Sequence, residues 1–430
     1  MKDIRFYLSF LILLAACSEQ SEPIQESVDN VEVEEVEPVV LTDRATGDTV
    51  PSNEPLKMGT GSVKLLPNVS RWRTPTEYAK KRHPLKQNKI QISLHRVDPV
   101  CLDSGIYLNG QENQLPPDTI PINEVSVKVK DPVQKSLLPM SYKDNAQYDI
   151  QYISAFHGLP TSNVNNVLQS KSGHIWMGSN VGLIRYDGQF IKTYDKSSGL
   201  PDNRITALAE DSQGRLWIGT ETGSLIRFDG DEFFYFDTDS LAAGYPVTNI
   251  AIDKSDDPWF TLRFFGFMNY SDHQLLHYGD EQGTHTNRPT TSISFMDNGE
   301  VWFTGYGRGL FRLTDNGIQQ LIGGSSIRLE SGYNHSGFFS STGDYYVAGW
   351  NPYVYIIRND SCFTYKMHYP PPINGVSKFR EDSRGRIWML CGDLGLLCWE
   401  DGYAAVYSDN EGLSSQYLSD FWIDRSDQVW

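Results

Sequence analysis

An aromatic residue recurs at nearly constant spacing through the last two-thirds of this 430-residue chain. The intervals between neighbouring positions run from 41 to 44 residues. The positions are Trp176, Trp217, Trp259, Trp302, Tyr346, Trp388 and Trp430. A fixed period of this size is typical of a repeat architecture, in which each unit buries its apolar face against its neighbour. We therefore predict that these seven aromatics pack between structural repeats.

One period contains four short strands. Residues 203–209 and 215–220 have strand character and are separated by a turn at Gly214. Residues 224–228 and 232–236 follow, separated by Asp229-Gly230, a strong hairpin signal. Helical repeats of similar length need apolar residues at a 3.6-residue period, which is missing here. The predicted fold class is therefore all-β: a β-propeller of four-stranded blades over residues 148–430, with seven blades and truncated in the seventh.

The N-terminus has the features of an export signal. Two basic residues precede an apolar run, residues 6–16, that is too short to span a bilayer. The run ends in Leu-Ala-Ala-Cys at Cys17, which resembles the lipobox of bacterial lipoproteins. That resemblance implies a signal peptide over residues 1–16 and a lipid on Cys17 that anchors the protein to a membrane. An ordinary signal peptide with an incidental cysteine is the alternative.

Two further segments precede the repeats. Residues 17–60 hold eleven acidic residues against Arg44 and Lys57, and no aromatic residue, which predicts a disordered tether. Residues 61–147 are rich in proline and slightly basic, and no fold can be assigned to them from the sequence. We expect their basic part to lie on the acidic propeller rather than on nucleic acid, because the protein is predicted to be exported.

The two ends of the repeat region suggest how the ring closes. Residues 149–157 stand directly before Gly158-Leu159-Pro160, where the fourth strand of a blade stands in other repeats. We predict that this strand completes the seventh blade from the other terminus, as in propellers that leave no exposed edge. The sequence stops at Trp430, inside the second strand of that blade. We therefore expect a piece of a longer protein, with an open or frayed ring.

The repeat can be compared with a known family. The frame GLPxxxVxxVxxDxxGxxWxGTxxGL, best preserved over residues 158–183 and 199–225, resembles the two-component regulator propeller repeat. Thr261, Thr304 and Ala348 depart from it, at the glycine that follows the aromatic. The resemblance implies the extracytoplasmic sensor of a bacterial signalling protein, often a Bacteroidetes-type hybrid histidine kinase that senses carbohydrate breakdown products. It also implies downstream signalling domains in the same protein, which residues 1–430 do not contain.

The strand order places the candidate ligand contacts on one face of the ring. Loops between the second and third strands of a blade, and loops between blades, emerge on the same side, and loops on a rigid scaffold are where binding residues collect. The candidates are Trp350, Phe264, Phe265, Tyr306, Arg308, Asn180, Glu221 and Asp393. Trp350 precedes Asn351-Pro352, so a turn would display its ring for stacking on a sugar. The alternative is that Trp350 packs against a neighbouring loop.

The sequence favours a binding module over an enzyme. It has no metal-ligand spacing of histidines, no nucleophile elbow and no phosphate-binding loop, so we predict no metal, no cofactor and no catalytic residue. An oligo- or polysaccharide is the expected ligand. Two alternatives are a lipid-anchored scaffold protein of the cell envelope and a glycan-active propeller. Cys391 and Cys398 flank one loop, where either a disulfide or two buried thiols is expected.

Overall fold

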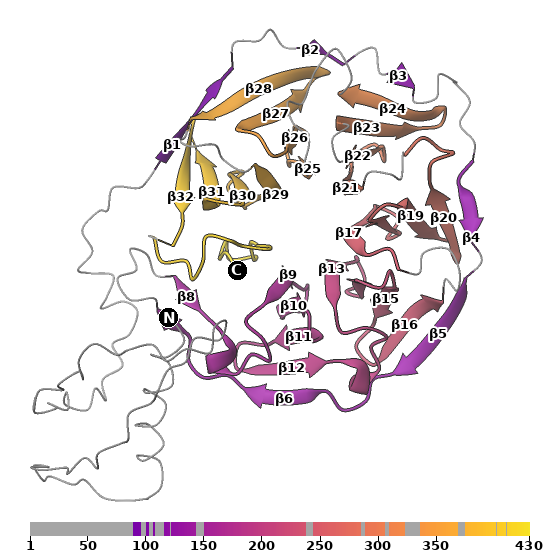
Figure 1. Ribbon diagram of the computed structural model, residues 1–430, viewed down its shortest axis with the longest axis vertical. Helices are drawn as coiled ribbons and strands as arrows, with labels where there is room; N and C mark the ends of the chain where they lie inside the picture. Colours follow the sequence, from indigo (N-terminus) through magenta and orange to yellow (C-terminus); the bar gives the residue numbers. More distant parts are fainter. Residues whose placement is uncertain are drawn as a thin grey trace, which may run out of the picture. The chain divides into compact units, whose positions relative to one another are not determined.

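Figure 1 shows the computed structural model of the chain. The structure describes residues 89–95, 100–102, 106–107, 116–120, 122–142, 150–237, 244–284, 289–305, 309–322, 336–368, 375–400, 402–409 and 411–430. All of them belong to one compact unit, residues 82–430. The predicted signal peptide, Cys17 and the tether lie outside the described residues, as do Tyr306 and Arg308. Among the described residues, no helix is long and apolar enough to cross a membrane.

Six blades of four antiparallel strands account for most of the described chain, which confirms the predicted β-propeller. In each blade consecutive strands are neighbours. Blades 1 to 3 contain β9 (Val164–Gln169), β10 (Ile175–Ser179), β11 (Leu183–Tyr186), β12 (Phe190–Tyr194), β13 (Ile205–Glu210), β14 (Leu216–Thr220), β15 (Leu225–Phe228), β16 (Glu232–Asp237), β17 (Val247–Ile252), β18 (Pro258–Leu262), β19 (Gly266–Ser271) and β20 (Gln274–Tyr278). Blades 4 to 6 contain β21 (Thr290–Phe295), β22 (Val301–Gly305), β23 (Gly309–Thr314), β24 (Gly317–Ile322), β25 (Ser336–Phe339), β26 (Tyr345–Ala348), β27 (Tyr353–Arg358), β28 (Ser361–His368), β29 (Val376–Glu381), β30 (Ile387–Cys391), β31 (Gly395–Glu400) and β32 (Tyr403–Tyr407).

The cores of the propeller lie between neighbouring blades. One apolar cluster combines Trp217 of blade 2 with Val247 and Phe260 of blade 3. A glycine after the aromatic permits this approach, because a Cβ on Gly219 would meet Val247 at 2.5 Å. Five of the seven repeat aromatics are buried: Trp176, Trp217, Trp259, Trp302 and Trp388. Tyr346 and Trp430 are half-buried.

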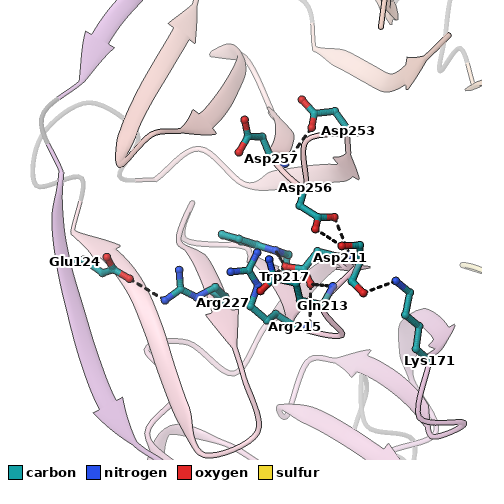
Figure 2. Close-up of polar contacts among 11 residues, drawn as sticks. Glu124, Lys171, Asp211, Gln213, Arg215, Trp217, Arg227, Asp253, Asp256 and Asp257 are labelled. Carbon is teal, nitrogen blue, oxygen red and sulfur yellow. Dashed lines mark hydrogen bonds and ion pairs between the residues drawn. The ribbon is translucent and has the colours of Figure 1, made fainter. Parts of the chain in front are cut away.

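The repeated Asp-x-x-Gly turn orients the core tryptophan. In blade 2, Asp211 accepts hydrogen bonds from the backbone N–H groups of Gln213 (3.1 Å) and Arg215 (2.9 Å) and from Trp217 Nε1 (3.0 Å), as Figure 2 shows. Blades 3 and 6 and the last hairpin repeat the tryptophan bond, with Asp253, Asp382 and Asp424 as acceptors. The aspartate stands six residues before the tryptophan in each of these repeats. This spacing places a carboxylate within hydrogen-bond distance of the indole N–H, which would otherwise be buried without a partner.

These turns also contact one another around the ring. The backbone N–H of Ser212 in blade 2 donates to Asp256 of blade 3 at 2.8 Å, and Ser383 of blade 6 donates in the same way to Asp427 at 3.0 Å. Lys171 of blade 1 reaches the carbonyl oxygen of Ser212 (Figure 2). We call the face that carries these turns the turn face, and the opposite face, with the loops between second and third strands and between blades, the loop face.

Residues 411–430 form a hairpin between blades 6 and 1. The backbones of Trp422 and Trp430 exchange two hydrogen bonds, of 3.0 and 2.8 Å. Asp420 binds Lys378 of blade 6 at 2.6 Å and accepts from the backbone N–H of Val167 in blade 1 at 3.1 Å. The hairpin therefore contacts both neighbours, so the ring is not open at its innermost strands, while fraying of this end stays a prediction.

The segment predicted to supply the closing strand has another partner in the structure, while its predicted partner, the third strand of a seventh blade, is not among the described strands, so closure by this strand stays a prediction. Within residues 150–157, the described part of that segment, only β8 (Gln151–Tyr152) is a strand, and its partner is β7 (Ser141–Tyr142). A 3₁₀ turn, η1 (Ala155–His157), follows, and η2 (Lys196–Ser198) is its counterpart before blade 2. His157 is buried and bonds Ser141 Oγ at 2.7 Å and Ser154 Oγ at 3.0 Å, so it fastens this segment to residues 141–142 instead.

Residues 89–142 form a belt of short strands around the outside of the blades (Figure 1). The belt runs against the order of the blades, so its last strands reach blade 1. Its strands are β1 (Lys89–Leu94), β2 (Val100–Cys101), β3 (Ile106–Tyr107), β4 (Asp118–Ile120), β5 (Asn123–Lys128) and β6 (Val133–Ser136). β6, β5, β4 and β3 each add a fifth strand to blades 1, 2, 3 and 4, respectively, while β1 pairs with blades 5 and 6. The described part of residues 61–147, to which the sequence assigned no fold, thus covers the outer edges of the blades.

Candidate functional site

Exposed apolar side chains gather on the loop face. Ten large apolar residues are exposed among the described residues. Six of them lie in loop-face segments: Phe156, Val181, Tyr245, Phe264, Trp350 and Tyr417. Three more lie on the belt, and Tyr403 alone lies on the turn face. Because loops on a rigid scaffold are where binding residues collect, the face that displays most of the exposed apolar side chains is the candidate functional site.

The densest part of this face is a stack of three rings in blade 3. Phe265 lies parallel to His277, with ring centroids 4.4 Å apart, and on Tyr245, with centroids 4.7 Å apart. His277 also holds the Phe265 carbonyl oxygen at 2.7 Å through Nε2. Tyr245, at one end of the stack, is 37% exposed. The stack therefore presents an aromatic ring to solvent on a rigid support.

Phe264 stands next to this stack in a strained turn. Its φ is +64°, and the Phe265 N–H donates to the Leu262 carbonyl at 3.3 Å, which closes a four-residue turn with Phe264 in its third position. A positive φ at that position normally requires glycine or asparagine. The side chain is 52% exposed, so burial does not offset the strain. Strain held without a packing gain is an indication of function.

Backbone hydrogen bonds join the neighbouring loops into one surface. The Arg263 N–H donates to the carbonyl of Pro246 (2.9 Å), and the Gly244 N–H donates to Thr222 (2.9 Å). The Glu221 N–H donates to the carbonyl of Arg204 at 3.0 Å. Blades 2 and 3 thus place a polar rim, which includes Glu221 and the exposed residues Arg204 and Arg263, beside Tyr245 and Phe264.

Trp350 lies on the same face but in blade 5. It is 48% exposed, so packing does not bury its ring. The backbone on either side is fixed, because Asn351 N–H and Val376 N–H both donate to the Gly349 carbonyl, at 2.8 and 3.2 Å. Gly375 has no room for a side chain, since a Cβ would lie 2.5 Å from the Trp350 Cα. A tightly packed backbone therefore displays this indole.

The remaining predicted residues are divided among several blades. Asn180 of blade 1 accepts from Asn165 Nδ2 at 2.9 Å, and Asp393 lies half-buried in the corresponding loop of blade 6. The structure brings together Phe264, Phe265 and Glu221, whereas Trp350, Asn180 and Asp393 belong to other sectors. Sequence reasoning missed Tyr245 and His277. The sequence feature that could have indicated Tyr245 is its position directly before Pro246, in a loop between blades.

No group of three or more His, Cys, Asp or Glu residues in the described part of the chain could hold a metal ion. A hollow of about 770 Å³ lies between the belt residues Pro116 and Pro117 and blade 4, near Glu300, and no predicted site residue lines it. The candidate contacts are thus open surface features rather than the walls of this hollow.

A charged cluster lies where the last hairpin meets blade 6. Asp420 is almost fully buried and faces Lys378 at 2.6 Å and Arg380 at 3.9 Å. Burial lowers the pKa of the Lys378 ammonium and of the Arg380 guanidinium, and the Asp420 carboxylate opposes both shifts. The Arg380 guanidinium also lies 4.0 Å from the centre of the Trp422 ring. Each of these charged side chains has a partner within the cluster, and the contacts run between blade 6 and the last hairpin. The cluster therefore joins these two parts of the ring.

The fold and the repeated turn define a β-propeller, and comparison with known proteins refines this. Residues 199–222 match the two component regulator propeller family, so the chain carries a repeat of that family. No curated protein matches the sequence. The fold is similar to the extracellular domain of the putative one component system BT4673 from B. thetaiotaomicron, with 19% identity and a TM-score of 0.51 over 62% of this chain and 37% of that one.

Two other solved structures resemble the chain. PorZ, an essential surface component of the type-IX secretion system of Porphyromonas gingivalis, has 14% identity and a TM-score of 0.49, over 65% of this chain and 46% of that one. Virginiamycin B lyase from Staphylococcus aureus has 12% identity and a TM-score of 0.48, over 70% of this chain and 93% of that one. The likeness to the BT4673 domain, at 19% identity, shows the fold alone, and the chain spans little more than a third of that domain.

Proposed function

We propose that this chain is the extracytoplasmic ligand-sensing propeller of a bacterial two-component signalling protein. The observation that carries the proposal is the gathering of exposed aromatics on the loop face, with the strained Phe264 beside the Tyr245–Phe265 stack. The match of residues 199–222 to the two component regulator propeller family supports the signalling context. Downstream signalling domains in the same protein, and a lipid on Cys17 as membrane anchor, are parts of the proposal that rest on the sequence.

The proposed ligand is an oligo- or polysaccharide. A sugar ring has an apolar face that stacks on an aromatic ring and hydroxyl groups that bind a polar rim. Tyr245 and Phe264 supply the aromatic surface, and Arg204, Glu221 and Arg263 supply the rim. Trp350 offers a second stacking position on the same face. Such a site binds and does not react, in agreement with a sensor rather than an enzyme.

The test is a binding screen with a matched control. Oligosaccharides are added to the purified chain, and the melting temperature and binding heat are recorded. Phe264→Ala and Trp350→Ala should each weaken binding of the active saccharide by about tenfold, since each removes one stacked ring. Tyr403→Ala removes an exposed aromatic from the turn face and should leave binding unchanged.

Two results would contradict the proposal. One is that no saccharide changes the melting temperature or produces heat. The other is that the loop-face variants bind as well as the Tyr403 control. If the loop-face variants instead lose association with other envelope proteins, the chain is a scaffold and the sensor proposal fails.

A further inference from the structure

The first strand of the belt differs from the others because it joins two blades. β1 lies between β28 of blade 5 and β32 of blade 6, antiparallel to both. Lys89, Ile90 and Gln91 pair with β32, and Gln91 to Leu94 pair with β28. One six-residue segment thereby merges blades 5 and 6 into a single sheet, whose ten strands are those of the two blades, β1, and β2, which pairs with β28 (Figure 1).

Alternate side chains of β1 enter the core between these blades. Ile90 is 1% exposed and Ile92 is 4% exposed, while Lys89 and Gln91 point to solvent. The two isoleucines belong to the same apolar cluster as Met367 of blade 5 and Ala404, Val406 and Leu397 of blade 6. In β-strand addition, main-chain bonds hold an extended peptide on a sheet and pockets for alternate side chains select it. β1 has both features.

Among the described residues, β1 and the residue after it make a few further contacts, including the rings of His95 and Tyr353, whose centroids are 5.4 Å apart. The Ile92 N–H donates to the Gly402 carbonyl, and the His95 N–H donates to the Thr364 carbonyl, both at 2.7 Å. Ser93 Oγ lies 2.5 Å from His368 Nε2. The attachment therefore consists of a short main-chain ladder and two aliphatic anchors, whereas blades 5 and 6 each keep four strands of their own.

We propose that blades 5 and 6 form a strand-acceptor groove, which binds an extended peptide carrying aliphatic side chains two residues apart. The chain's own Lys89–Leu94 is the peptide that fills it. The groove is an interaction surface separate from the loop face, and its partner is recognised through backbone pairing and two apolar pockets. A second peptide of this pattern binds once the internal strand is displaced.

The test uses the full chain and a labelled peptide of residues 88–96. An Ile90→Ser/Ile92→Ser variant removes both anchors and opens the groove, and it should bind the peptide in a fluorescence polarisation titration. The wild-type chain should bind at least about tenfold less, because a tethered strand acts at millimolar effective concentration. Lys89→Ser/Gln91→Ser changes the exposed side of the same strand and should behave like wild type. A peptide with both isoleucines replaced by serine should not bind.

Hydrogen exchange on the wild-type chain provides a second measurement that does not depend on the variant folding. If the groove is separable from its strand, the amides of β1 exchange faster than those of β27, β28, β31 and β32, as a local opening. The proposal is overturned if β1 exchanges together with these four strands. It is equally overturned if the folded double variant binds no peptide.

Discussion

Trp217 and Trp350 show how the same side chain serves two purposes in this fold. The Trp217 indole is 1% exposed and donates to Asp211, whereas the Trp350 indole is 48% exposed on the loop face. Trp217→Ala should therefore lower the free energy of unfolding by roughly 3–5 kcal/mol, the usual cost of removing a buried tryptophan. Trp350→Ala should lower the free energy of unfolding much less. Equal shifts of the denaturation midpoint would show that Trp350 belongs to the core.

Phe264 allows stability and binding to be separated. Replacing it with glycine relieves the positive φ and removes little buried surface, so Phe264→Gly should raise the free energy of unfolding by about 1 kcal/mol while weakening ligand binding. Phe264→Ala removes the same ring but keeps a strained side-chain-bearing residue, so it should weaken binding without stabilising the fold. Thermal melts and titration calorimetry on both variants check this. A Phe264→Gly variant that is less stable than Phe264→Ala would contradict the strain argument.

The Asp382 turn predicts a specific response to acid. Burial alone raises the pKa of this carboxyl, but hydrogen bonds from Trp388 and Arg386 outweigh burial and lower its pKa below the ordinary value. A carboxyl with a lower pKa in the folded state stabilises the protein above its unfolded pKa, and this contribution is lost as the pH falls through the folded pKa. Wild type should therefore lose stability below about pH 4.

Asp382→Asn should lose less stability over the same acidic range, because its side chain does not titrate. Denaturant titrations at a series of pH values measure the effect. Asp297→Asn, which removes a fully exposed carboxylate, is the control. If Asp382→Asn and wild type lose stability in parallel, the turn carboxylate is not what makes the fold acid-sensitive.

At the scale of the strand, the register between β30 and β31 determines whether the thiols of Cys391 and Cys398 can form a disulfide. Cys398 lies opposite Trp388, and Cys391 lies opposite Gly395, so the two cysteines do not face each other. Both are buried and free, which excludes the disulfide alternative in this structure. Burial raises the pKa of Cys391 to about 12 and that of Cys398 to about 11.

These thiols should be unreactive in the folded protein. Because a thiolate is the reactive form, a raised pKa and burial both slow alkylation. Residue-specific mass spectrometry after iodoacetamide treatment should find Cys362, Cys391 and Cys398 unmodified until denaturant is added. Modification of Cys398 under native conditions would mean that blade 6 opens locally.

The strands of the blades were predictable and the belt was not, for a physical reason. In blade 2 the strands follow one another across short turns, so Asp211, Gly214 and Asp229-Gly230 mark their limits in the sequence. The belt strands instead pair with residues far along the chain, as Glu124 does with Phe236 and, through its carboxylate, with Arg227 (Figure 2). The four residues of β6 are all exposed, so buried and exposed side chains do not alternate along it. The sequence therefore has no local pattern that predicts this strand.

The candidate site was predictable to a similar extent. The position of Phe264 and Phe265 between two strands was enough to place them on the loop face. The stacking of Tyr245 and His277 on Phe265 depends on how two loop segments meet the strand β20, and each segment alone gives little sign of it. The positive φ of Phe264 is likewise imposed by the turn, since nothing in the side chain itself favours it.

At the scale of the whole molecule, one carboxylate connects the two ends of the ring. Asp420 of the last hairpin binds the Lys378 ammonium of blade 6 with one oxygen and the Val167 N–H of blade 1 with the other. Arg425 of the same hairpin donates to Gln169 and Ser170 of blade 1. In a repeat protein each unit is stabilised mainly by its neighbours, so these contacts decide whether the first and last units hold together.

Asp420→Ala should therefore loosen the closure of the ring. The substitution leaves the partly buried Lys378 without its counter-charge, which should lower the free energy of unfolding by up to about 3 kcal/mol. The loss should be local to this junction rather than spread across all blades. In hydrogen exchange, the amides of the last hairpin and of β9 should lose protection, while those of blades 2 to 4 should keep it. Asp427→Asn, which neutralises an exposed carboxylate of the hairpin and keeps an acceptor for Ser383 of blade 6 and a residue that tolerates the positive φ of 59°, is the matched control and should change exchange little. Unchanged protection of the hairpin in Asp420→Ala would mean that packing of Phe421 and Trp422, rather than this carboxylate, closes the ring.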